Sequence, residues 1–279
     1  MREVSYADIA AALERLFVEA NTELSPDVVE RIEEAVLQEA SPIGREVLKE
    51  LLANARIARE QQVPICQDTG LAVVFMEVGQ DVHLTGGGLS EAVEEGVRNA
   101  YRKGYLRKSC CHPFSRMNTG DNTPAILHTS IVPGEQVRIV VMPKGGGSEN
   151  YGEVRMLVPS EGREGVKAFV KEMVERGGPN PCPPITIGVG VGGNLETAAI
   201  LSKEALLVPF GLRSNEPDMA DLELDILGEI NSLGIGPGGY GGTTTALDVH
   251  IKVLPCHIAS LPVAVNIQCH AHRMREALL

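Results

Sequence analysis

The first sixty residues carry apolar side chains at helical spacing. Behind Ser5, a residue type that caps helices, apolar residues recur every three or four positions as far as Phe17. Ser25-Pro26 and Ser41-Pro42 each place a cap before a proline at the first helical position. These patterns predict one helix behind Ser5 and two more over residues 26–39 and 42–61.

From residue 71 onward, apolar runs of strand length alternate with segments of helical spacing. Residues 71–78 are nearly all apolar, as in a buried strand. The other predicted strands are 125–132, 136–142, 185–191, 244–254 and 261–267, and the other predicted helices are 90–103, 163–176, 194–207 and 217–232. A helical block over about residues 1–62, followed by mixed strands and helices, predicts a mixed α/β (α+β) fold forming one domain over residues 1–279.

Composition and charge narrow the class of protein. The chain has 279 residues, of which 43% are hydrophobic, which is enough for a large apolar core. A net charge of −12 disfavours nucleic acid and anionic membranes as partners, although a local arginine cluster could still bind a small anion. We find no signal peptide and no run of membrane-spanning length, so we expect a cytoplasmic protein. Its six cysteines should then be ligands or core residues, because thiols stay reduced there.

Three of the cysteines stand alone at the ends of apolar or proline-bearing runs: Cys66, Cys182 and Cys269. Separate cysteines on loops can converge on one iron–sulfur cluster, and a cubane held by three thiolates keeps one iron open to substrate. The alternative for Cys182 is an ordinary buried cysteine. Asp68, two residues after Cys66, is either a turn former or a site residue.

The remaining cysteines favour structural functions. Cys110 and Cys111 are adjacent and cannot easily bind one ion together, and no second pair lies at zinc-finger spacing. We expect Cys256 to be structural as well. A polar cluster precedes the strand predicted from residue 125, and its side chains suit either a solvated loop or a carboxylate ligand. Its members are Arg107, Arg116, Asn118, Asp121 and Asn122.

Gly188–Gly193 matches the dinucleotide-binding pattern G-x-G-x-x-G between a strand and a helix. This pattern keeps a nucleotide-binding oxidoreductase as an alternative function. No acidic residue follows about twenty positions later, where a ribose partner would stand. Close backbone packing is the competing explanation for these glycines.

Five motifs occur together and in order along the chain. They are Cys66-Gln67-Asp68-Thr69-Gly70, Asn118-Thr119-Gly120-Asp121-Asn122-Thr123-Pro124-Ala125, Lys144-Gly145-Gly146-Gly147-Ser148-Glu149-Asn150, Cys182-Pro183-Pro184 and Gly188-Val189-Gly190-Val191-Gly192-Gly193. With them the chain resembles class I, iron–sulfur-dependent fumarate hydratases and the related L-tartrate dehydratases, from about residue 50 onward. The resemblance implies a fold like the N-terminal domain of class I fumarases.

The same resemblance implies a cofactor and a site. In the family three cysteines hold a catalytic 4Fe–4S cluster, and they match Cys66, Cys182 and Cys269. The residues implied to line the substrate are Gln67, Asp68, Arg107, Gly146 and Gly147. Asp68 would also assist acid–base catalysis, and the planar fork of Arg107 suits a carboxylate.

The resemblance implies a lyase, a fumarate hydratase of the tricarboxylic acid cycle. Such an enzyme reversibly hydrates fumarate to L-malate, with the open iron as Lewis acid. The family has a single-chain form and a two-subunit form. This chain ends ten residues after Cys269 and has no counterpart of the family's second-domain threonine, arginines and lysine. We therefore expect an α subunit that needs a β subunit, as an α2β2 heteromer. The α subunit of L-tartrate dehydratase is the close alternative.

Overall fold

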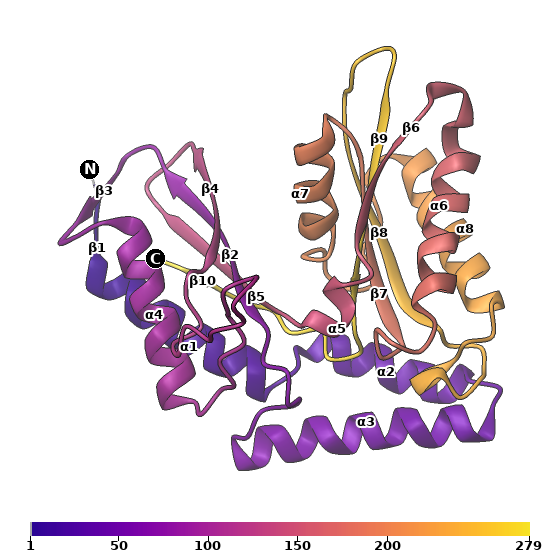
Figure 1. Cartoon of the computed structure of the whole chain (residues 1–279), viewed down its shortest axis with the longest axis horizontal. Coiled ribbons are helices and arrows are strands. Elements are labelled where there is room, and N and C mark those ends of the chain that lie inside the picture. Colours follow the sequence, from indigo (N-terminus) through magenta and orange to yellow (C-terminus); the bar gives the residue numbers. More distant parts are fainter. Residues whose placement is uncertain (1) are drawn as a thin grey trace. The chain divides into compact units, whose positions relative to one another are not determined.

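The computed structural model describes residues 2–279. Their contacts divide the chain into two compact units (Figure 1). Unit 1 comprises the residues through Ser25, Asn54–Gly146 and Arg273–Leu279, and unit 2 comprises Pro26–Ala53 and Gly147–His272. Each unit has its own four-stranded sheet and its own apolar core. No helix within residues 2–279 has the length and apolar character needed to cross a membrane.

Unit 1 is built on a sheet whose strands lie in the order β10 (Arg275–Leu278), β5 (Val137–Lys144), β2 (Leu71–Gly79) and β4 (Ile126–Val132). β2 pairs antiparallel with β5 and parallel with β4. Every second residue of β2 from Ala72 to Val78 packs in one core with helices α1 (Tyr6–Thr22) and α4 (Leu89–Lys103). The two helices therefore cover one face of this sheet.

The start of the chain folds as its local sequence predicts. The Asp8 N–H donates to Ser5 Oγ at 3.2 Å, and the Ser5 N–H donates to Asp8 Oδ2 at 3.2 Å. This reciprocal capping box begins α1. A short strand that the sequence did not reveal, β1 (Arg2–Ser5), precedes the helix and pairs parallel with β3 (Val82–Thr85).

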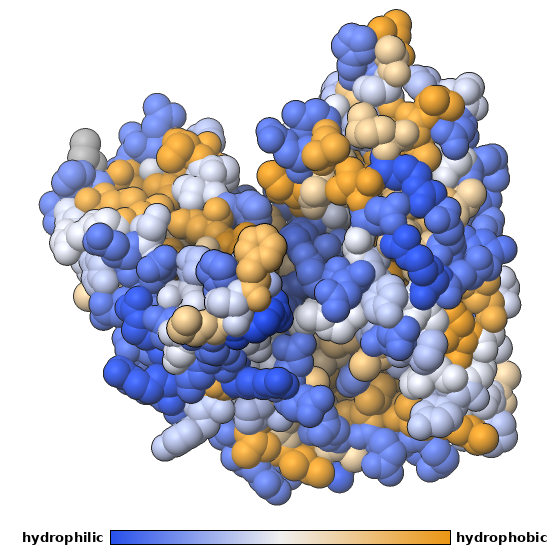
Figure 2. All heavy atoms as spheres, in the orientation of Figure 1, coloured by the Kyte–Doolittle hydropathy of each residue, from blue (hydrophilic) through white to orange (hydrophobic). Residues whose placement is uncertain are grey.

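At the β4 edge of the four-stranded sheet of unit 1, apolar side chains reach the surface. Figure 2 shows apolar atoms gathered over the region of β2 and β4 in unit 1. Ile126 and Ile131 of β4 are 40% and 68% exposed. β4 is an edge strand with many outward-facing residues, which is why its apolar run is less buried than that of β2.

Unit 2 is built on a sheet with strand order β6 (Glu153–Leu157), β9 (Leu261–Gln268), β7 (Ile185–Gly192) and β8 (Ala246–Leu254). β7 and β8 are parallel, and the other pairs are antiparallel. Helices α6 (Gly162–Gly177) and α8 (Pro217–Ser232) share the core on one face, and α7 (Leu195–Ala205) lies on the other (Figure 1). Helix α2 (Pro26–Gln38) packs near β8.

The predicted helices and strands are confirmed, and so is the mixed α/β class. Helix α3 (Pro42–Gln61) begins at its predicted proline, and its residues are divided between the two units. The predicted helical block over residues 1–62 is thus helical but contributes to both units. The sequence missed β1, β3, β6, β10 and the four-residue helix α5 (Gly146–Glu149). The four strands have only four or five residues each, too few for a clear apolar period.

Candidate functional site

Cys66, the first predicted ligand, lies in the loop between α3 and β2, and hydrogen bonds between side chains and the main chain hold this loop in place. The Asp68 N–H donates to Cys66 Sγ, with 3.4 Å between nitrogen and sulfur, and Cys66 is half-buried. The Tyr101 hydroxyl donates to the carbonyl oxygens of Thr69 at 2.7 Å and Gly70 at 2.9 Å. Burial raises the pKa of Tyr101 well above its usual value, so the hydroxyl keeps its proton and remains a donor.

The Asp68 carboxylate joins this loop to the end of β5. Its Oδ1 accepts the Gly70 N–H at 3.0 Å, and its Oδ2 accepts the Gly146 N–H at 2.8 Å. A Cβ added at Gly145 would lie 3.2 Å from Oδ2, so a larger residue there would press on the carboxylate. The Gly70 bond is the turn contact considered from sequence. The Gly146 bond adds a tertiary contact that fixes the orientation of the carboxylate.

The other residues predicted to contact substrate lie at the surface. The Thr69 hydroxyl donates to the Arg107 carbonyl oxygen at 2.8 Å, so the Arg107 main chain lies beside the Asp68 loop. The side chains of Gln67 and Arg107 are exposed, and no hydrogen bond or ion pair engages either of them within residues 2–279. Gly146 belongs to unit 1 and Gly147 to unit 2, and both are exposed.

Part of the predicted polar cluster has a structural function. Asn122 is fully buried, and its Oδ1 accepts the N–H groups of Ser109 at 2.6 Å and Cys110 at 3.2 Å. Its Nδ2 donates to the Gly70 carbonyl oxygen at 3.1 Å. Asp121 pairs with Arg98 at 3.1 Å. These contacts fold the loop, which leaves Arg107 and Arg116 as the exposed cations of the cluster.

Cys182 and Cys269 come together in unit 2. The His270 N–H donates to the Cys182 carbonyl oxygen at 3.2 Å, and the Nδ1 of the same histidine lies 3.3 Å from that oxygen. Cys182 is exposed and has a φ of 57°, in the left-handed region, while Cys269 is half-buried. The alternative of an ordinary buried cysteine at 182 is therefore wrong. Cys66 belongs to unit 1.

The other cysteines differ in their surroundings. Cys110 is buried, and burial raises the pKa of its thiol, which disfavours the thiolate that a metal requires. Cys111 forms an isolated β-bridge with Asn118. Cys256 is exposed, and its Sγ lies 3.2 Å from the Ser260 carbonyl oxygen. Across the described part of the chain, no three histidine, cysteine or acidic side chains form a group placed to hold a metal ion.

The G-x-G-x-x-G motif has a packing explanation. Gly188 and Gly190 lie inside β7 and face α7, not a turn that could cradle a phosphate. A Cβ at Gly188 would collide with the Ser202 carbonyl oxygen, and one at Gly190 with that of Ala198. These glycines therefore allow α7 to approach the strand closely, as the competing explanation held.

One residue near the site escaped the sequence analysis. Arg273 is only 1% exposed, and its Nη1 donates to the Asp68 carbonyl oxygen at 2.5 Å and to Asn21 Oδ1 at 3.0 Å. The available sequence clue was its position four residues after Cys269. Nothing in the local pattern indicated that its guanidinium is buried.

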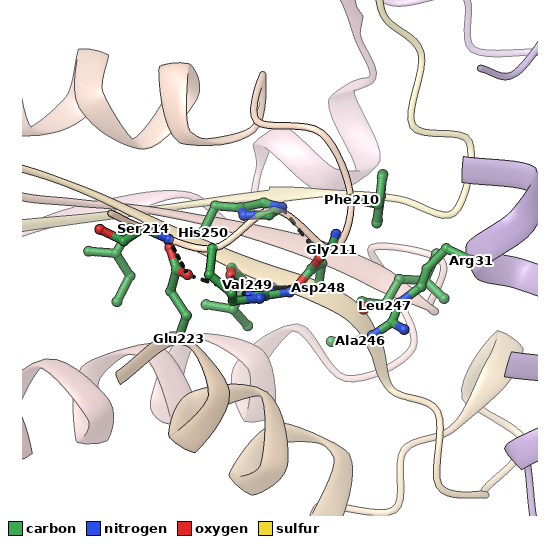
Figure 3. A network of polar contacts seen from close by, with 12 residues as sticks. Arg31, Phe210, Gly211, Ser214, Glu223, Ala246, Leu247, Asp248, Val249 and His250 are labelled. Carbon is green, nitrogen blue, oxygen red and sulfur yellow. Dashed lines mark hydrogen bonds and ion pairs between the residues drawn. The ribbon is translucent and has the colours of Figure 1, made fainter. Parts of the chain in front are cut away.

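A second group that escaped the sequence analysis is a buried polar network in unit 2 (Figure 3). Asp248, which is fully buried, pairs with Arg213 and accepts the Gly211 N–H at 2.8 Å. Glu223, 2% exposed, accepts the Ser214 N–H at 3.2 Å. These two carboxylates hold the 207–216 loop against β8 and α8.

His250 gives this network a testable pH dependence. The ring is 1% exposed, and its Nε2 lies 3.5 Å from Asp248 Oδ2 without a hydrogen bond. Burial lowers the pKa of His250 to about 4; Asp248 opposes this shift and Arg213 reinforces it. Between pH 6.5 and 4 the unfolded chain therefore binds a proton that the folded chain does not. Stability should fall as the pH drops through this window.

We expect His250→Phe to remove this loss. The free energy of unfolding should drop about 1.5 kcal/mol less between pH 6.5 and pH 5 in the variant than in the parent, because the slope approaches about 1.36 kcal/mol per pH unit only once the unfolded histidine is mostly protonated. Urea unfolding at both pH values measures the difference. Burial also raises the pKa of Glu223, but this residue titrates in both proteins and drops out of the comparison. Equal pH dependence in the two proteins would contradict the prediction.

Comparison with known proteins agrees with the motif set. The family model described as "Fumarate hydratase (Fumerase)" matches residues 10–277. A protein of Methanocaldococcus jannaschii named "Putative L(+)-tartrate dehydratase subunit alpha" is 42% identical over 271 residues, 95% of each chain. The "L(+)-tartrate dehydratase subunit alpha" of Escherichia coli O157:H7 is 36% identical over 263 residues, covering 93% of this chain and 86% of the relative. The protein of the same name from Shigella sonnei is also 36% identical over 263 residues.

Proposed function

The chain belongs to the fumarate hydratase family of hydro-lyases, and from this premise we propose that it is the cluster-binding α subunit of a dicarboxylate hydro-lyase. The observation that carries the proposal is the linked arrangement of Cys66, Asp68 and Gly146. One hydrogen-bonded loop presents a candidate ligand and a fixed carboxylate, and that carboxylate binds the first residue of α5, the short helix after β5.

The donor set of the chain fits an iron–sulfur cluster. Fe–S clusters are bound by cysteine thiolates, and Cys66, Cys182 and Cys269 are each at least partly accessible. The Asp68 N–H directed at the Cys66 sulfur is a contact that would stabilise a thiolate. When bound, a 4Fe–4S cluster with three protein ligands supplies a Lewis-acidic iron with an open position.

The chain's own residues bind and orient the substrate in this proposal. Arg107 and Gln67 offer exposed donors for a carboxylate, and Gly146 and Gly147 allow a ligand to approach the main chain closely. Asp68 keeps lone pairs beyond the two that accept N–H groups, so it can accept a further proton or hydrogen bond. Its fixed orientation would direct that lone pair at the substrate.

We expect Arg107→Lys to raise the KM for the dicarboxylate by about ten- to a hundredfold. Lysine keeps the charge but loses the planar fork, and a charge-assisted bidentate contact contributes roughly 1.5–3 kcal/mol. Steady-state kinetics of the assembled, cluster-loaded complex measures the effect. Arg102→Lys, an exposed arginine at the end of α4, is the matched control and should leave KM unchanged. An unchanged KM for Arg107→Lys with intact cluster would remove this residue from the site.

Fumarate and L-malate are the first candidate substrates, in keeping with the family model. L-tartrate is the second, because the similar proteins carry that name. Both reactions remove water from a 2-hydroxydicarboxylate and need the same acid–base chemistry. Turnover of L-malate and L-tartrate by the assembled complex, prepared without oxygen, decides between them through the ratio of kcat/KM values. A complex that contains iron and sulfide yet converts neither acid would overturn the proposal.

A further inference from the structure

The guanidinium of Arg273 is buried without a carboxylate partner. The residue is 1% exposed and forms no ion pair within residues 2–279. Its Nε also has no hydrogen-bond partner there. Burying a guanidinium that forms no ion pair costs free energy, and a neutral donor could satisfy the same acceptors at a smaller cost. The charge therefore calls for an explanation other than stability.

The contacts of Arg273 converge on Asp68. Nη1 donates to the Asp68 carbonyl oxygen at 2.5 Å. A Cβ added at Gly145 would lie 3.3 Å from Arg273 Nη2 and 3.2 Å from Asp68 Oδ2, so both groups border the same glycine. Arg273 thus contacts the main chain of the residue whose side chain binds the Gly146 N–H. The guanidinium holds the Asp68 peptide, while the carboxylate of the same residue binds the first residue of α5.

The nitrogen that binds the Asp68 peptide is also anchored to helix α1. Nη1 also donates to Asn21 Oδ1 at 3.0 Å, and Asn21 is fully buried. The Asn21 amide is itself oriented, because its Nδ2 donates to the Phe17 carbonyl oxygen at 2.9 Å. The Asn21 carbonyl oxygen accepts the Ile65 N–H at 2.8 Å, one residue before Cys66. Helix α1 therefore serves as a fixed base for the loop, with Arg273 as the link.

We infer that Arg273 is a positioning residue for the proposed hydro-lyase reaction: it fixes the Asp68 peptide, and with it the directions of the Cys66 sulfur and the Asp68 carboxylate. This inference rests on the proposed function. A charge-assisted hydrogen bond to a carbonyl oxygen is shorter and stronger than a neutral one, which suits a loop that must not shift. Displacing a catalytic group by about 1 Å can lower a rate about a hundredfold.

The experiment compares Arg273→Lys with Arg275→Lys in the assembled, cluster-loaded complex. Arg275 is a matched control, because it lies two residues after Arg273 and is also largely buried. It donates to the Glu23 carbonyl oxygen at 3.0 Å, just beyond the end of α1, but does not contact Asp68. We expect Arg273→Lys to lower kcat about ten- to a hundredfold, with KM changed less than about threefold and iron per chain unchanged. Arg275→Lys should keep kcat within about twofold. Guanidinium ion added to Arg273→Ala should restore part of kcat.

A second readout needs no catalysis. In the apo full-length chain, amide hydrogen exchange over residues 66–70 should become about tenfold faster in Arg273→Lys and stay unchanged in Arg275→Lys. If Arg273→Lys lowers the melting temperature but keeps kcat per cluster at the parent value, Arg273 has only a structural function and the inference is wrong.

Two further outcomes are also decisive. If the Arg273 variants do not fold, Asn21→Ala takes their place, because it removes the acceptor on α1 and leaves Arg273 present. A several-fold fall in kcat with full iron content then supports the inference, and an unchanged kcat overturns it. A parent complex that holds no iron, or converts neither L-malate nor L-tartrate, instead contradicts the proposed function, whatever the variants do.

Discussion

Replacing Cys66, Cys182 or Cys269 with serine, one at a time, is expected to abolish bound iron and activity together. Serine preserves the size of the side chain but not the soft thiolate that iron–sulfur clusters require. Because a cubane cluster with three protein ligands needs all three, each single substitution should abolish both iron binding and activity. Iron and sulfide analysis, visible absorbance and turnover, all on anaerobically purified complex, measure the result.

The matched controls are Cys110→Ser and Cys111→Ser. Cys110 is buried with a raised thiol pKa, and Cys111 is half-buried, as Cys66 and Cys269 are. Both variants should keep iron and activity, although serine at the buried position can lower stability slightly. If iron binding depended on Cys110 and survived the loss of Cys182, the assignment of ligands would be wrong.

The isolated, cluster-loaded chain is expected to show less than about 1% of the turnover of the complex with its β subunit. The similar proteins are named α subunits, which implies a partner chain, and we expect that chain to supply part of the substrate site. Without the partner's groups the dicarboxylate would be held at one end only, and a misaligned substrate reacts about a hundredfold more slowly or worse. Malate turnover with and without the β subunit measures the difference.

Two further measurements make this result specific. Equal iron content in the isolated chain and in the complex separates loss of the partner from loss of the cluster. Native mass spectrometry of the complex gives the stoichiometry, for which we expect α2β2. Full turnover by the chain alone would show that its catalytic set is complete and would contradict the assignment as a subunit.

The helices and long strands could be predicted because their causes are local. Pro26 and Pro42 begin α2 and α3 as expected, and the apolar run from Leu71 forms β2. A cap, a proline at the first turn or a continuous apolar run acts over a few residues, so it can be recognised in a short window. The motif around Cys66, Gln67 and Asp68 was recognisable for the same reason.

The short strands could not be predicted, because each one exists through its partner. β6 pairs with β9, and β10 pairs with β5 across more than a hundred residues of chain. A segment of four or five residues has no apolar period of its own and becomes a strand only when an open edge accepts it.

The sequence by itself determined the family, the candidate ligands and the order of the main elements. Only the tertiary structure decided how Asp68, Asn122 and Arg273 act. Asp68 reaches Gly146, Asn122 turns inward to support a loop, and Arg273 is buried against the Asp68 peptide. The partners of Asp68 and Arg273 lie 78 and 205 positions away, and a polar side chain looks the same in sequence whether it faces water or a distant main chain. Burial and hydrogen bonding follow from the packing of both partners, so no local pattern records them.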